Sequence, residues 1–147
     1  MAYEVFDVKK YGKGYSVSLG SHTFSEEEIT EFAKQFDPLP FHTDPHAGKE
    51  SRFGRLISSG AQPFNYFHVY RWIPLFGKTV IAGLEINSWK FLNPVGTRDE
   101  MHCKVSITDI KLNAEKKHAV ISWKYEIFLS NNLPAQVLES NILHYTG

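Results

Sequence analysis

Cysteine is nearly absent from this sequence: Cys103 is the only one among 147 residues. A single cysteine cannot form an internal disulfide, which excludes the small secreted domains that depend on a disulfide framework. One free thiol is also compatible with a reducing compartment. We therefore expect the chain to work in the cytoplasm.

Long apolar runs are also missing. No window approaches the roughly 20 consecutive apolar residues that a membrane-spanning helix needs. The opening stretch MAYEVFDVKK contains acidic residues and lacks an apolar core of signal-peptide length. The sequence therefore predicts a soluble protein without membrane association.

An excess of charge of one sign is the third absence. Lys plus Arg and Asp plus Glu both number 16, and the longest like-charged run is the three glutamates at 26–28. This balance argues against nucleic acid or an anionic membrane as partner and favours a neutral small molecule. The length fits one compact domain, and no repeat or flexible linker divides it, so we expect a single domain over residues 1–147.

Helical signals are concentrated in the first half of the chain. Ser25 and Glu28 have the spacing of a capping box, and Pro38 disfavours helical geometry at the residue before it, so a helix is expected from about residue 26 to 36. Its apolar stripe is expected to face the core and comprises Ile29, Phe32, Ala33 and Phe36.

A second helix is expected in the stretch AQPFNYFHVYRWI, where apolar and aromatic residues cover nearly every side. This pattern is typical of a helix surrounded by protein. Pro63 is tolerable in a first turn, and we expect Pro74 with Gly77 to end the helix.

The second half of the chain alternates with the period of β-strands. The cleanest alternation runs from Ala119 to Leu129, and a run beginning at Met101 changes phase after Asp109, which suggests a bulge. A curved antiparallel sheet would bury more of an apolar helix than a flat one, at about 25 cal/mol per Å². The predicted fold class is therefore α+β: a hot dog fold, with a curved antiparallel sheet wrapped around a central buried helix.

The stretch QFDPLPFHTDP contains candidate acid/base residues. Asp37 and His42 lie five residues apart with Pro38 and Pro40 between them, and two fixed φ angles reduce the entropy lost in placing a carboxylate beside an imidazole. Histidine titrates near neutrality, so the two can act as an acid/base pair. The alternative is an exposed loop in which both side chains are solvated or act as caps.

A candidate binding group lies before the second helix. Ser58, Ser59 and Gly60 are small, and amides in the first turn of a helix lack helical partners. The Gly60 amide could hold a carbonyl oxygen that becomes negatively charged during a reaction. A glycine that only permits a turn is the alternative.

Two stretches of the sequence resemble the MaoC-like acyl dehydratases and (R)-specific enoyl-CoA hydratases. FDPLPFHTDPHAGKESRFGRLISSG is similar to their signature region, and KFLNPVGTRDEMHCKVSI resembles a segment that joins two long strands; the resemblance covers the chain from about Phe24 to the end. It implies that Asp37 and His42 are catalytic, holding a water that adds to C3 of a trans-2-enoyl thioester, with the reverse reaction dehydrating a 3-hydroxyacyl thioester. It assigns the Gly60 amide to the thioester oxygen.

The resemblance also implies no metal and no cofactor, because coenzyme A or acyl carrier protein arrives as part of the substrate. It implies a homodimer, since hot dog domains pair their sheets edge to edge. A metal site built from His42, Asp44 and His46 is disfavoured, because Pro45 disturbs their spacing and no further histidine or cysteine lies nearby.

Two positions depart from the family pattern. Leu39 stands where such hydratases often have Asn, and His68 lies near the place of a serine on the central helix. His68 could brace the site, point into the core or narrow the acyl pocket; we favour a packed or hydrogen-bonded histidine. Because both polar partners are missing, a hot dog acyl-CoA thioesterase and a non-catalytic acyl-thioester-binding protein stay open as alternatives.

Overall fold

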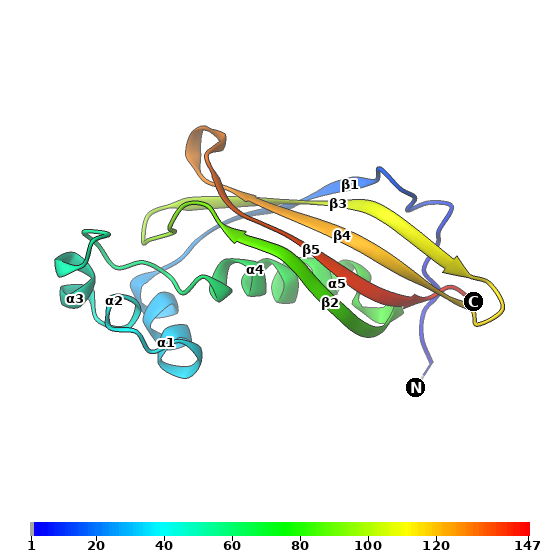
Figure 1. Ribbon diagram of the computed structural model, residues 1–147, viewed down its shortest axis with the longest axis horizontal. Coiled ribbons are helices and arrows are strands. Elements are labelled where there is room, and N and C mark those ends of the chain that lie inside the picture. The colour runs from blue at the N-terminus through cyan, green and yellow to red at the C-terminus, as the bar shows by residue number, and fades with distance from the viewer. Residues whose placement is uncertain (1) are drawn as a thin grey trace.

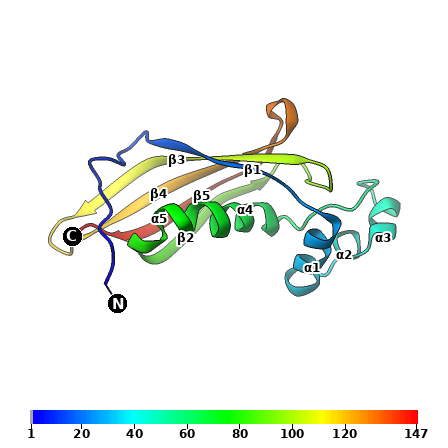
Figure 2. The ribbon, with the colours of Figure 1, turned by 180° about the vertical axis from the view of Figure 1, so that it is seen from behind.

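The computed structural model describes residues 2–147 and contains one curved antiparallel sheet with a helical segment along one face (Figures 1 and 2). The strand order is β1-β3-β4-β5-β2. The α+β class expected from the sequence is confirmed. The strands are β1 (Ser16–Thr23), β2 (Val80–Phe91), β3 (Glu100–Asn113), β4 (His118–Phe128) and β5 (Pro134–Tyr145).

The helical elements form two groups. Three short helices gather at one end of the molecule, and the central helical segment runs beside the sheet (Figure 1). No helix within residues 2–147 is both long and apolar enough to cross a membrane. The elements are α1 (Glu26–Phe36), α2 (Pro40–Thr43), α3 (Pro45–Glu50), α4 (Ala61–Phe67), the π-helical η1 (His68–Trp72), α5 (Ile73–Phe76), and the 3₁₀ turns η2 (Gly77–Thr79) and η3 (Ser130–Asn132).

Helix α1 begins and ends where the sequence predicts. The Ser25 hydroxyl accepts from the Glu28 amide and the Glu28 carboxylate accepts from the Ser25 amide, which completes the capping box. The predicted apolar stripe is only partly correct. Ile29 and Ala33 are buried, but Phe36 is 68% exposed because α1 extends beyond the end of the sheet.

The prediction that Pro74 with Gly77 ends the central helix is correct for Gly77, which caps α5, but not for Pro74, which the helical segment passes. The segment passes from α4 through the π turn η1 into α5, which contains Pro74 in its first turn. A proline in a helix removes one backbone donor and crowds the preceding turn. The wider π turn just before it changes the hydrogen-bonding pattern there, so the chain stays helical as far as Phe76.

The central segment is buried on one side only, which corrects the prediction of a helix enclosed all round. Phe67 and Trp72 face the sheet and are almost fully buried. Val69, Tyr70 and Ile73 lie on the opposite side and are exposed, Tyr70 by 65%. The five strands of one chain cover one face of the segment, and its outer face has no cover from residues 2–147.

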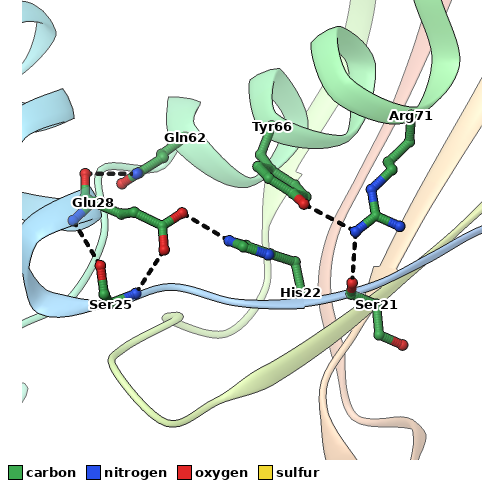
Figure 3. A network of polar contacts seen from close by, with 7 residues as sticks. All are labelled: Ser21, His22, Ser25, Glu28, Gln62, Tyr66 and Arg71. Carbon is green, nitrogen blue, oxygen red and sulfur yellow. Dashed lines mark hydrogen bonds and ion pairs between the residues drawn. The ribbon is translucent and has the colours of Figure 1, made fainter. Parts of the chain in front are cut away.

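A network of polar contacts fixes α1 and β1 against α4 (Figure 3). The Gln62 side-chain amide donates to the Glu28 backbone carbonyl at 2.9 Å, and the Glu28 carboxylate lies 2.7 Å from Nε2 of His22 on β1. The His22 ring stacks on Tyr66 with centroids 3.9 Å apart, and Arg71 donates to the Tyr66 hydroxyl at 3.0 Å. These contacts set the position of α1, and with it the position of the residue that follows α1.

The strand pairing contains the predicted bulge. The register between β3 and β4 shifts between Ile107 and Asp109, where the apolar alternation changes phase. The turn between β4 and β5 lies at residues 129–133, and Asn131 and Asn132 have positive φ angles that asparagine tolerates better than most residues.

One histidine is buried completely between the sheet and the central segment. The Nδ1 atom of His144 lies 2.7 Å from the Thr79 hydroxyl, and Nε2 lies 3.1 Å from the indole nitrogen of Trp123. An indole N–H can only donate, so Nε2 carries a lone pair and His144 is neutral. Burial lowers the pKa of His144 to about 4.

Candidate functional site

Asp37 lies at the end of α1, where the chain turns sharply. Its amide donates to the Ala33 carbonyl at 2.8 Å, which completes the last turn of the helix. The Leu39 amide then donates to the Asp37 carbonyl at 2.7 Å, so Pro38 sits in a tight turn. The carboxylate is about one-third exposed and belongs to the wall of a pocket.

His42 lies on the short helix α2, which begins at Pro40. The side chain is buried, with the residue 5% exposed, and its Nδ1 atom lies 2.7 Å from the Ile57 carbonyl oxygen. A carbonyl can only accept, so Nδ1 carries the proton. In the neutral ring, Nε2 therefore has a lone pair.

The structure brings Asp37 and His42 together, as the spacing predicts. Nε2 of His42 lies 3.5 Å from Oδ2 of Asp37. With a neutral imidazole both atoms are acceptors and do not bond to each other, whereas an imidazolium would donate toward the carboxylate. The burial of His42 departs from the exposed-loop alternative, in which both side chains are solvated.

Ser59 completes this cluster. Its hydroxyl donates to Oδ2 of Asp37 at 2.7 Å. The sequence indicates only that Ser59 is small, because a serine before a glycine is typical of a turn. The two partners are 22 positions apart in the sequence, so no local pattern identifies the contact.

Gly60 lies beside the cluster, immediately before α4. The Gly60 carbonyl accepts from the Gln136 side-chain amide at 2.7 Å. The Trp89 indole N–H donates to the side-chain Oε1 of Gln136 at 3.3 Å. A Cβ at position 60 would lie 2.9 Å from the Phe91 ring, so glycine permits this close approach. Within residues 2–147, the Gly60 amide has no hydrogen-bond acceptor.

A pocket of about 420 Å³ brings the three predicted site residues together. Asp37, His42 and Gly60 all contribute to its wall, and most of the remaining lining is apolar. A site of this kind, mostly apolar with a few convergent polar groups, is typical of small-molecule binding. The other lining residues are Phe41, Phe53, Ile57, Ser58, Phe91, Leu92, Asn93, Pro94, Val95 and Gln136.

His68 does not belong to this pocket. Its Nδ1 atom lies 2.8 Å from the buried Tyr125 hydroxyl, and its ring stacks on Trp72 with centroids 5.0 Å apart. Burial lowers the pKa of His68, so the neutral form is favoured. The prediction of a packed or hydrogen-bonded histidine is confirmed, since His68 is both.

Asp44 and His46 do not join His42 in a ligand cluster. The Asp44 carboxylate accepts from the His46 amide at 3.0 Å and so caps α3. Within residues 2–147, no three His, Cys, Asp or Glu side chains are arranged to hold a metal ion.

Solved structures with the same fold include dehydratases and hydratases. The MaoC-like dehydratase from Rhodospirillum rubrum has a TM-score of 0.81 at 22% identity, covering 95% of this chain and 97% of that one. The (R)-hydratase from A. caviae involved in PHA biosynthesis has a TM-score of 0.72 at 24% identity, covering 93% and 98%. These similarities establish the hot dog fold.

A sequence relative and a family model match this chain, and the family model identifies the family. The uncharacterized protein YdeM of Bacillus subtilis (strain 168) is 34% identical over 86 residues, which span 58% of this chain and 61% of YdeM. The model of the MaoC like domain matches residues 10–126. The chain therefore belongs to the MaoC-like domain family.

Proposed function

We propose that this protein hydrates trans-2-enoyl thioesters, or in reverse dehydrates 3-hydroxyacyl thioesters. The observation that carries this proposal is the 3.5 Å separation of His42 Nε2 and Asp37 Oδ2 in a pocket that Gly60 also lines. Membership of the MaoC-like family, and the resemblance in fold to a dehydratase and an (R)-hydratase, support the same reaction type.

The pair is suited to hold one water molecule. With Nδ1 bonded to the Ile57 carbonyl, a neutral His42 offers an acceptor at Nε2, and Asp37 offers carboxylate oxygens beside it. A water has two protons and can donate one to each acceptor. Its oxygen lone pairs are then directed away from both side chains, toward a substrate in the pocket.

The proposed reaction moves atoms as follows. The water oxygen bonds to C3 of the enoyl thioester while the Asp37–His42 pair accepts one water proton, and the C2–C3 π electrons move toward the thioester carbonyl. The pair then returns a proton to C2, giving the 3-hydroxyacyl thioester. The pair thus acts first as a base and then as an acid, which requires no net change in its protonation.

The Gly60 amide is the proposed partner of the thioester oxygen. This amide has no acceptor within residues 2–147. The side-chain amide of Gln136 donates to the Gly60 carbonyl and so holds Gly60 in place. A donor placed where negative charge develops contributes about 3 kcal/mol of transition-state stabilisation. The proposed chemistry uses neither a metal ion nor a redox cofactor; coenzyme A or acyl carrier protein is part of the substrate.

Hydration can be measured with crotonyl-CoA and longer trans-2-enoyl-CoAs. We expect loss of the conjugated absorbance and formation of 3-hydroxyacyl-CoA, with no release of free thiol. A parallel incubation with saturated butyryl-CoA is the control, because thiol released there would identify a thioesterase. Binding of enoyl-CoA without any product, across chain lengths, would identify a non-catalytic binding protein instead.

We further propose that two copies pair in solution. Strand β2 is an edge of the sheet with no further strand beside it in residues 2–147. Leu84 and Ile86 on this strand are about half exposed, as are Val69 and Ile73 on the central segment. A second copy could cover both the edge and the apolar surface. Light scattering at micromolar concentration should give twice the chain mass of 16.8 kDa, and a monomer would contradict the pairing.

A further inference from the structure

We propose that Ser59 is a positioning residue that holds the Asp37 carboxylate in its working orientation. This inference rests on the hydration function proposed above, since it assigns to Ser59 a role in that reaction. The Ser59 hydroxyl donates to Oδ2 of Asp37 at 2.7 Å, and Oδ2 is the carboxylate atom that lies 3.5 Å from His42 Nε2. Ser59 thus orients the Asp37 carboxylate without lying between Asp37 and His42.

Ser59 is itself buried, and its backbone is hydrogen-bonded. The residue is 1% exposed, its carbonyl accepts from the Gln62 amide at 3.0 Å, and the preceding residue Ser58 donates its amide to the Val95 carbonyl at 2.7 Å. The Ala61 amide points at the Ser59 hydroxyl oxygen from 3.4 Å. A hydroxyl has one proton, so its single donor bond is committed to Asp37.

The Asp37 carboxylate needs a hydrogen-bond donor to fix its orientation, because its side chain is partly exposed to solvent. The side chain is 35% exposed and follows the last turn of α1, so water competes for its oxygens. Within residues 2–147, no other group donates a hydrogen bond to this carboxylate. Without the Ser59 hydroxyl, rotation about the Asp37 side-chain bonds would give several orientations, of which only some point an oxygen at the water beside His42.

The competing explanation is that Ser59 only caps the start of α4. Its contact with the Ala61 amide is long, whereas the bond to Asp37 is short and involves a charged acceptor. Hydrogen bonds to charged groups are the stronger kind. A capping role predicts an effect on stability alone, whereas a positioning role predicts an effect on turnover.

The first test compares Ser59→Ala with Ser59→Thr in the hydration assay. We expect Ser59→Ala to lower kcat about 10- to 100-fold while KM changes less than about threefold, because the bond orients a reacting group and not the substrate. Ser59→Thr retains the hydroxyl and should recover most of kcat. A kcat for Ser59→Ala within twofold of the wild type, or a change in KM alone, would refute the proposal.

Ser122→Ala is the matched control. Its hydroxyl also donates a 2.7 Å bond, to Asn141, and it is also largely buried, but it lies in the sheet away from the pocket. This variant should lose a comparable hydrogen bond without losing kcat. An equal loss of kcat in Ser122→Ala would mean that Ser59 contributes only to general stability.

A second test does not require activity. In a double-mutant cycle of Ser59→Ala and Asp37→Ala, followed by thermal unfolding, Ser59→Ala should lower Tm by about 2 to 5 °C in the wild type and clearly less when Asp37 is already alanine. Additive effects would mean that Ser59 does not hold Asp37. If the wild type lacks hydratase activity but the cycle is non-additive, the proposed function fails while the contact between the two residues stands.

Discussion

The Asp37→Asn variant is expected to lose about three orders of magnitude in kcat/KM for hydration, the range typical of removing a general acid/base group. Asparagine keeps the shape of the side chain and can still accept from Ser59, so the fold should be retained. It cannot carry the negative charge that stabilises an imidazolium at His42, 3.5 Å away. Initial rates with crotonyl-CoA measure the loss.

Asp44→Asn provides the control for this prediction. Asp44 lies seven positions further along the same proline-rich stretch and is exposed, and its side chain caps α3. The substitution makes the same chemical change outside the pocket and should leave the rate within about twofold, since asparagine is also a good cap. An Asp37→Asn enzyme as active as Asp44→Asn would exclude Asp37 from the reaction.

Stability should fall markedly in acid because of the buried His144. In the folded protein its pKa is about 4, against 6.5 for an ordinary histidine, so between these values the unfolded chain binds a proton that the folded chain does not. This contribution to stability is complete above about pH 6.5 and is lost as the pH falls toward 4. The loss amounts to about 3 kcal/mol in the free energy of unfolding.

Urea unfolding at a series of pH values tests this prediction, with His144→Gln as the matched variant. Glutamine does not titrate and can still bond to Thr79 and Trp123, the two partners of His144. Its stability should vary with pH by about 3 kcal/mol less than that of the wild type. Some dependence should remain, because burial also lowers the pKa of His68. Identical pH dependence in both proteins would contradict the prediction, because it would mean that the pKa of His144 is the same in the folded and unfolded states.

Local signals in the sequence predict those elements whose causes are local. The capping box at Ser25 and the proline at 38 define α1 from neighbouring residues alone, and the phase change after Asp109 reveals the bulge in β3. The course of the central segment past Pro74 was not predictable in this way. It depends on a π turn, whose hydrogen bonds follow no residue pattern that separates them from those of an α-helix.

Burial of apolar surface was predicted less well than secondary structure. Phe36 and Tyr70 fit an apolar pattern but are exposed. Phe36 is exposed because α1 extends beyond the end of the sheet. Tyr70 is exposed because the strands formed by residues 2–147 cover one face of the central segment. An apolar stripe indicates that a surface prefers to be covered, without saying whether the same chain or a second copy covers it.

The candidate site was predictable in its components but not in its details. The stiff spacing of Asp37 and His42 is visible in the sequence, since Pro38 and Pro40 lie between them. The contacts that define their chemistry come from residues far along the chain: the carbonyl that fixes the His42 tautomer is 15 positions away. Such contacts depend on the packing of α4 against α1 and α2. This packing is tertiary structure, which local sequence patterns do not predict.

A crystal structure of the Asp37→Asn variant with crotonyl-CoA tests the central claim most directly. We expect the thioester oxygen within hydrogen-bonding distance of the Gly60 amide, and C3 facing a water bound by His42 Nε2. An acyl group bound outside the pocket of Asp37, His42 and Gly60, or a thioester oxygen directed away from the Gly60 amide, would contradict the proposed mechanism.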